Sequence, residues 1–194
     1  GDYSVEVQNQ SSSLSFETNP LSITLDPIAG AANSYVDVGD FTGIDNSDSW
    51  TLHGGFYMTS NDVGTHQTLM CDGGNIVNGY VVWVDGGAFY LRVNSEFTVG
   101  PDNENGSTDT IEYQFEADQW YDFTWVVKPE NGSHSHHAIY INGFLIFEGL
   151  FPNVTINTNN PMQFGKSYYS DNNLDYAFNG LLDNIHIWDK ALSQ

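Results

Sequence analysis

Basic side chains are nearly absent from this sequence, which has 4 Lys and Arg against 25 Asp and Glu and a formal net charge of −21. A field of that sign repels phosphate, so nucleic acids and anionic membrane surfaces are excluded as electrostatic partners. The sequence also has no apolar run as long as a membrane span, and its first residues lack the basic and apolar regions of a secretion signal. We therefore expect a soluble part of a larger multidomain protein that does not insert into membranes.

Cysteine is almost missing as well. The single Cys71 cannot form an intramolecular disulfide, so packing or a metal ion must hold the fold together. With 194 residues, 40% of them hydrophobic and 14% aromatic, the chain has enough apolar mass for one sizeable core and too much for a disordered acidic tail. The acidic, lysine-poor composition is typical of exported proteins in calcium-rich or salty water, which predicts an extracellular or cell-surface location.

The chain reads as short extended runs separated by Gly, Asn and Asp, without a long helical apolar period. Asp85-Gly86-Gly87 and Asn142-Gly143 carry the residues that tight hairpin turns require. We predict one all-β domain over residues 1–194, a two-sheet antiparallel sandwich with Greek-key crossings that is closed by a helical turn after Trp188. Strands are expected at residues 14–17, 21–25, 35–38, 49–59, 67–71, 79–85, 88–93, 111–115, 120–127, 137–141, 144–148, 162–165 and 178–188.

Several segments occur in a recognisable order. Residues 34–38 form an early strand, a Trp-rich strand at 120–125 precedes Ile139-Tyr140-Ile141-Asn142-Gly143, and residues 178–188 are followed by Ala191-Leu192-Ser193. Together these segments resemble the laminin-G-like, concanavalin A-like superfamily, which includes pentraxins and many carbohydrate-binding modules. The resemblance covers residues 33–193 and implies the jelly-roll fold, but a fold alone does not decide a function.

Two loops are rich in the oxygen ligands that calcium prefers. One contains Asp171, Asn172, Asn173 and Asp175, and the other is the turn from Asp72 to Asn75. The resemblance to pentraxins implies that such loops pair around a calcium ion that receives the ligand. The alternative is two ordinary turns, because Asp, Asn and Gly are the commonest turn residues.

Three tyrosines, Tyr168, Tyr169 and Tyr176, flank the first of these loops. Their rings can stack on the apolar face of a pyranose, and a sugar with two adjacent hydroxyls can replace two calcium waters. We therefore predict that these tyrosines, with Asp72 and Asp171, contact the ligand. One of the three is expected to be half-buried at the edge of the sandwich instead.

Asp183 lies in the closing strand, where alternation places it on the same face as Ile185 and Ile187. A carboxylate on that inward face needs a partner. The resemblance to laminarinase-like glucanases implies a structural calcium ion here, with Glu17 or Asp37 as companions. The open alternative is that backbone amides at a strand bend donate to the carboxylate.

Other polar and aromatic groups are given plainer interpretations. The loop Asp102–Gly106 is expected to be solvated, and the run His134–His137 is expected to be a polar loop at a hairpin tip. The resemblance implies that Trp120 and Trp125 are structural, whereas Trp83 remains open as a sugar-stacking residue.

Catalysis is not expected. The Glu-x-Asp-x-x-Glu strand that glucan hydrolases of this fold use is absent, and Glu112 and Glu116 are better explained as the solvent face of an edge strand. Cys71 has no nearby base in the sequence.

We therefore predict a calcium-dependent lectin module for neutral sugars that serves adhesion, since anionic sugars would be repelled by the charge. The resemblance to ligand-binding domains of large calcium-dependent bacterial adhesins implies glucose-type or fucose-type glycans. The alternative is a calcium-stabilised protein-interaction or spacer module that binds no sugar.

Overall fold

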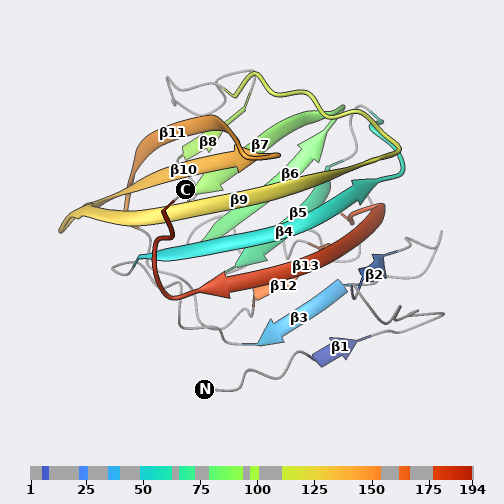
Figure 1. The fold of residues 1–194 in the computed structure, drawn as a ribbon, viewed down its shortest axis with the longest axis horizontal. Coiled ribbons are helices and arrows are strands. Elements are labelled where there is room, and N and C mark those ends of the chain that lie inside the picture. The colour runs from blue at the N-terminus through green and yellow to red at the C-terminus, as the bar shows by residue number, and fades with distance from the viewer. Residues whose placement is uncertain are drawn as a thin grey trace.

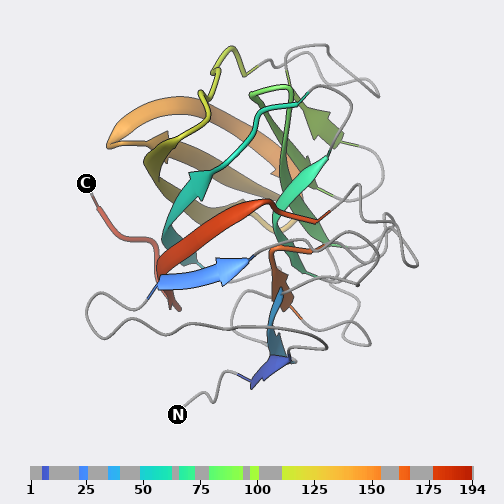
Figure 2. The same cartoon turned by 90° about the vertical axis from the view of Figure 1, so that its right-hand side faces the viewer.

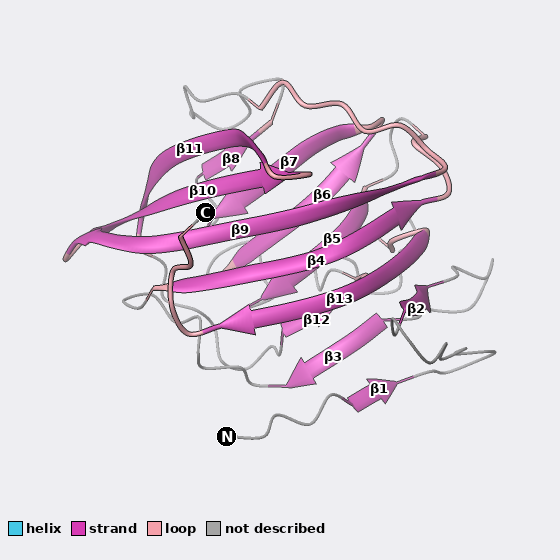
Figure 3. Ribbon diagram, viewed as in Figure 1, coloured by secondary structure: helices cyan, strands magenta, loops and turns pink. Residues whose placement is uncertain are grey.

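The computed structural model describes residues 6–8, 22–25, 35–39, 49–62, 66–72, 79–93, 97–100, 111–153, 162–166 and 177–193. Within these ranges the regular structure consists entirely of strands, as Figure 3 shows. None of the described residues forms a helix with the length and apolar character needed to cross a membrane. The predicted all-β class is confirmed.

The strands form two antiparallel sheets that lie face to face (Figures 1 and 2). The seven-stranded sheet has the order β1-β3-β12-β5-β6-β7-β8, and the six-stranded sheet has the order β11-β10-β9-β4-β13-β2. Their bounds are β1 Glu6–Gln8, β2 Ser22–Leu25, β3 Tyr35–Gly39, β4 Trp50–Met58, β5 Gln67–Asp72, β6 Tyr80–Asp85, β7 Ala88–Val93, β8 Phe97–Val99, β9 Gln119–Asn131, β10 His134–Ile141, β11 Phe144–Pro152, β12 Met162–Phe164 and β13 Gly180–Trp188.

The chain passes repeatedly from one sheet to the other. It leaves the six-stranded sheet after β4, makes the meander β5-β6-β7-β8, and returns for the meander β9-β10-β11. β12 then lies between β3 and β5, and β13 lies between β4 and β2. These crossings confirm the predicted jelly-roll sandwich, in which strands distant in sequence become neighbours.

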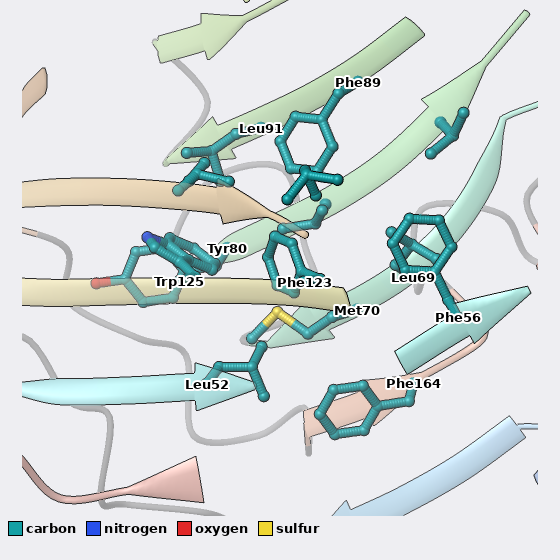
Figure 4. Packing of buried hydrophobic residues seen from close by; sticks show 14 of the residues in the cluster. Leu52, Phe56, Leu69, Met70, Tyr80, Phe89, Leu91, Phe123, Trp125 and Phe164 are labelled. Atoms are coloured by element: carbon teal, nitrogen blue, oxygen red, sulfur yellow. The ribbon is translucent and has the colours of Figure 1, made fainter. Parts of the chain in front are cut away.

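Aromatic rings fill much of the space between the sheets (Figure 4). Trp50 of β4 packs edge-on against Trp125 of β9 at 4.8 Å between ring centroids, and Tyr80 of β6 lies 5.2 Å from Trp125. The three rings therefore join both sheets. Each edge-on pair contributes about 1 kcal/mol beyond the area that it buries.

Both predicted hairpin turns are confirmed. Gly86 and Gly87 have φ of 57° and 81°, and Asn142 and Gly143 have φ of 51° and 78°. These positive values are the left-handed conformations that Asn and Gly adopt most easily. The Asn142 side chain also accepts a hydrogen bond from the backbone N–H of Asp122 at 2.9 Å, which ties the second turn to β9.

Several predicted boundaries are wrong. Residues 111–115 do not form a strand and contribute only an isolated bridge from Gln114 to Ala88. The residues after Trp188 do not form the expected helical turn. The strands Glu6–Gln8 and Phe97–Val99 were not predicted, because three-residue strands are too short to show an alternating pattern. The predicted strand at 14–17 lies outside the described residues.

The prediction of a polar loop at His134–His137 is also wrong. The turn lies earlier, at Asn131-Gly132-Ser133, where the Asn131 side chain accepts hydrogen bonds from the backbone N–H groups of Ser133 and His134. Strand β10 therefore begins at His134, and β9 extends to Asn131. This shift places His137 inside the core, at 0% exposure.

Candidate functional site

Most of the predicted loop ligands lie outside the described residues. These are Asn75, Asp171, Asn172, Asn173 and Asp175, together with the predicted sugar-contacting tyrosines Tyr168, Tyr169 and Tyr176. Asp102–Gly106 and Glu17 lie outside them as well. Asp72 and Asp183 are therefore the two predicted calcium ligands that the structure places.

Asp72 is the last residue of β5 and is only 2% exposed. It lies opposite Tyr80, whose ring belongs to the core, and directly paired residues of two strands project to the same face. The Asp72 carboxylate therefore faces the other sheet at the point where β5 ends. A carboxylate that is this buried needs compensation from a cation or from hydrogen-bond donors.

The described residues that flank the predicted ligand loop lie along β5, on the side away from Asp72. The N–H of Gly165, which follows β12, donates to the carbonyl of Leu69 at 3.0 Å, and the N–H of Phe178 donates to the carbonyl of Gly165 at 3.0 Å. The described residues on either side of segment 167–176 are therefore joined to each other next to β5. Leu69 precedes Asp72 by three residues, so this neck lies about 10 Å along the strand from Asp72.

The predicted inward orientation of Asp183 is wrong. β13 contains a register shift between Asp183 and His186, and Asn184 has a φ of 51°. Leu182 and Ile185 both pack against the core although they are three residues apart, which shows that the bulge interrupts the alternation. Asp183 therefore lies on the outer face of the six-stranded sheet.

The bulge gives the Asp183 carboxylate a local role. One oxygen accepts a hydrogen bond from the backbone N–H of Asn184 at 2.8 Å, and the other accepts one from the Asn184 side chain at 3.3 Å. This arrangement matches the alternative in which a backbone amide satisfies the carboxylate at a strand bend. Of its two suggested companions, Asp37 accepts a hydrogen bond from Gln163 at 3.2 Å.

Replacing Asp183 by alanine is expected to lower the free energy of unfolding by about 1 kcal/mol, because the hydrogen bond to the bulge is lost. The loss should be equal in calcium and in EDTA. Urea unfolding of the Asp183→Ala protein in both conditions measures it. A loss seen only with calcium would instead assign a metal ion to Asp183.

Trp83 is covered on the outer face of the seven-stranded sheet. Its ring stacks on Tyr90 at 5.0 Å with an interplanar angle of 5°, and on His66 at 5.8 Å. The Arg92 guanidinium lies 5.5 Å from the ring centroid, and Trp83 is only 6% exposed. Neighbouring side chains thus occupy the surface that a sugar would need, so Trp83 serves packing.

Trp120 departs from the structural role implied for it, because its side chain is 45% exposed. In β9 the residues at positions 121, 123, 125 and 127 face the other sheet, so position 120 faces outward. Tyr57, which lies opposite Trp120 on β4, has its ring centroid 5.7 Å away. The structural role implied for Trp125 is confirmed, since Trp125 is 0% exposed.

Sequence reasoning missed this outward pair, although a signal was available. Trp120 and Trp125 are an odd number of residues apart in one extended run, so they must face opposite sides of a strand. Because Trp125 packs inside, Trp120 has to lie outside. Only the sheet order shows that Tyr57 lies beside it.

Among the residues that the structure describes, His137 has the most strongly shifted pKa. It faces the core from β10, and the indole N–H of Trp125 donates to its Nδ1 at 3.2 Å. Because an indole N–H can only donate, Nδ1 must be the unprotonated nitrogen, and the Nε2 proton is donated to the Ser135 hydroxyl at 2.8 Å. Burial, with a smaller effect of His136, lowers the pKa of His137 from 6.5 to about 3.

No group of three or more His, Cys, Asp or Glu side chains suited to a metal ion occurs among the described residues. Glu112 and Glu116 are exposed, as expected for a solvent-facing segment, and Cys71 is buried.

Comparisons with known proteins agree on the fold. A laminin G family model described as the concanavalin A-like lectin/glucanases superfamily matches residues 30–194. No curated protein sequence matches the chain significantly. The residues matched by the family model include every strand from β3 to β13.

Three solved structures illustrate the similarity. Domain 4 of AbnA, an extracellular arabinanase from Geobacillus stearothermophilus in complex with arabinotriose, is 16% identical, with a TM-score of 0.66 over 98% of this chain and 83% of that chain. The CBM40 of the Ruminococcus gnavus IT-sialidase, bound to α2,3 sialyllactose, is 13% identical, with a TM-score of 0.57 over 89% and 94%. The botulinum neurotoxin serotype G binding domain is 13% identical, with a TM-score of 0.61 over 98% and 44%.

Proposed function

We propose that this chain, which belongs to the concanavalin A-like lectin/glucanases superfamily, is a carbohydrate-binding module without catalytic activity that recognises neutral glycans outside the cell. The observation that carries the proposal is that the structural similarity covers most of the length of two sugar-bound domains. The arabinotriose-bound and sialyllactose-bound domains are each covered to at least 83% of their length by this chain. The similarity therefore extends over an isolated binding domain in each case.

The charge of the chain favours neutral ligands. With 25 acidic and 4 basic residues, its field repels sialic and uronic acids, whereas a neutral hydroxyl-rich ligand is unaffected. A single site of this kind is expected to have a dissociation constant of about 1 mM, and adhesion would then require many copies presented together. Glucose-type and fucose-type glycans are the first candidates.

We further propose that sugar binding depends on calcium held by Asn75 and the loop of Asp171, Asn172, Asn173 and Asp175, with Asp72 as a buried member of the set. The burial of the Asp72 carboxylate, which needs compensation from a cation or from hydrogen-bond donors, supports this. When bound, calcium would supply coordination positions for two adjacent sugar hydroxyls. Tyr168, Tyr169 and Tyr176 are the proposed stacking residues, and Asp183 is left out because Asn184 already donates to its carboxylate.

A glycan array probed in calcium and again in EDTA tests the proposal. We expect neutral glycans to bind in calcium, and EDTA and the Asp171→Ala substitution to weaken this binding by at least about tenfold with little change in melting temperature. The matched control is Asp189→Ala, which removes an exposed carboxylate near the end of the chain. Its binding should equal that of the unmodified protein.

An array that stays silent with and without calcium would contradict the carbohydrate proposal. It would favour the alternative of a protein-interaction module, which one observation supports. Phe144, Leu145 and Leu150 of the edge strand β11 are 75%, 50% and 53% exposed, so three of the four exposed large hydrophobic side chains among the described residues lie on that edge.

A further inference from the structure

The outer face of the six-stranded sheet carries an aromatic pair that the loop site does not use. We propose that Trp120 and Tyr57 form a second carbohydrate site, which binds one neutral pyranose unit without a metal ion. This site adds to the proposed function and does not depend on the calcium loops. Asp72 ends β5 of the seven-stranded sheet and faces the core, whereas Trp120 and Tyr57 lie on the outer face of the other sheet, on the neighbouring strands β9 and β4 (Figure 1).

The indole of Trp120 lies against the sheet. Its Cε3 and Cζ3 atoms would be 3.6 Å from a β-carbon added to Gly55, so the ring covers this position of β4. The ring nevertheless remains 45% exposed, so it keeps a surface on which the C–H groups of a sugar can stack.

Carboxylates border this aromatic surface. Gly55 is paired with Asp183 on one side and with Asp122 on the other. Neighbouring strands are about 4.8 Å apart, so these two residues lie about 10 Å apart on either side of Gly55. Asp118 accepts a hydrogen bond from the Tyr57 hydroxyl at 3.3 Å. The rim thus provides acceptors for hydroxyl groups on both edges of a sugar ring.

This combination selects the ligand class. An apolar ring surface matches the C–H face of a pyranose, and the surrounding carboxylates accept its hydroxyl protons. A sialic or uronic acid would meet three carboxylates and be repelled. A quaternary ammonium ion would need rings that enclose it, whereas Tyr57 and Trp120 are tilted by 53° and form an open surface.

Binding in EDTA tests this site separately from the calcium loops. Neutral glycans that bind on an array in EDTA are titrated into ¹⁵N-labelled protein, and the indole N–H signals of the 5 tryptophans are followed. The Trp120 signal is the one missing from the Trp120→Phe variant. We expect this signal to shift, and Trp120→Ala to weaken binding by about tenfold.

Matched variants separate stacking from hydrogen bonding. Phe144→Ala removes another exposed aromatic side chain, at the β10–β11 hairpin, and should bind as the unmodified protein does. Asp122→Asn should weaken binding less than Trp120→Ala, because an amide oxygen still accepts a hydroxyl proton. Melting temperatures of all variants should stay close to that of the unmodified protein, because the altered side chains are exposed.

The outcomes distinguish the two proposals. Binding that disappears in EDTA, or that is unchanged in Trp120→Ala, overturns the second site and leaves the calcium site standing. Binding that persists in EDTA and weakens in Trp120→Ala supports the second site. Choline that shifts the Trp120 signal when no neutral glycan does so would overturn the assignment of ligand class.

Discussion

Acidification from pH 7 to pH 4 is expected to lower the free energy of unfolding by about 3 kcal/mol through His137 alone. The folded protein holds this imidazole neutral, with a pKa of about 3, whereas the unfolded chain protonates it with a pKa of 6.5. Between these two pKa values the unfolded state binds more protons than the folded state. The contribution of His137 to stability is therefore fully present above pH 6.5 and is lost progressively as the pH falls toward 3. Each pH unit within this window costs about 1.4 kcal/mol.

Stability is lost on acidification because the His137 ring lies in the core. Protonation would place a charge on a ring at 0% exposure, and the added proton at Nδ1 would remove the acceptor of the Trp125 indole N–H. The ring also lies 4.8 Å from that of Phe151, in surroundings that cannot solvate an ion. Neither effect can be relieved without opening the sandwich.

Urea unfolding at a series of pH values measures this dependence. The His137→Gln variant should be less stable at pH 7 than the unmodified protein. Its free energy of unfolding should also fall less steeply between pH 6.5 and pH 3, because the titrating imidazole is gone. The matched control is His136→Gln, which alters the half-buried neighbour that pairs with Glu148 at 3.0 Å and leaves the core intact. Equal pH slopes in the unmodified protein and in His137→Gln would show that His137 does not govern its acid sensitivity.

The second large effect is expected for Gly180→Ala. Gly180 lies at the start of β13, opposite Met58 of β4, and a β-carbon there would collide with the backbone carbonyl oxygen of Tyr57. It would also lie 2.9 Å from the Phe178 ring, which is itself in the core. Because a backbone carbonyl in a sheet cannot move aside, we expect a loss of about 3 kcal/mol in the free energy of unfolding.

Two other glycines provide controls for this substitution. A β-carbon at Gly132 would have no atom within 4 Å, and this residue lies in an exposed turn, so Gly132→Ala should be close to neutral. Gly143 has the same open surroundings but a φ of 78°, so Gly143→Ala should cost about 1 kcal/mol through backbone strain alone. Thermal or urea unfolding that ranks the three differently would contradict the steric explanation.

The fold could be predicted well because its signals are local. Alternating apolar residues and the turn Asn142-Gly143 mark strands and hairpins wherever they occur in a chain. Errors arose where one local feature competed with another. The polarity of His134–His137 suggested a loop there, although the turn residues Asn131 and Gly132 come just before this run. The predicted hairpin tip therefore fell inside strand β10.

The site was harder to predict, as Asp183 and Trp120 show. Strict alternation placed Asp183 inside, but the bulge at Asn184 reverses the alternation in the middle of β13. Trp120 was given a packing role by resemblance, although its odd spacing from Trp125 pointed outward.

The sequence by itself determined the all-β class, the approximate positions of most strands and the strongly acidic charge that favours neutral ligands, because these depend on composition and short-range periodicity. Only the tertiary structure decided which side chains meet. The pairing of β4 with β9 brings Tyr57 to Trp120 across more than sixty residues of chain, and that of β9 with β10 brings His137 to Trp125 inside the core. Such contacts follow from strand register and sheet order, which long-range packing selects.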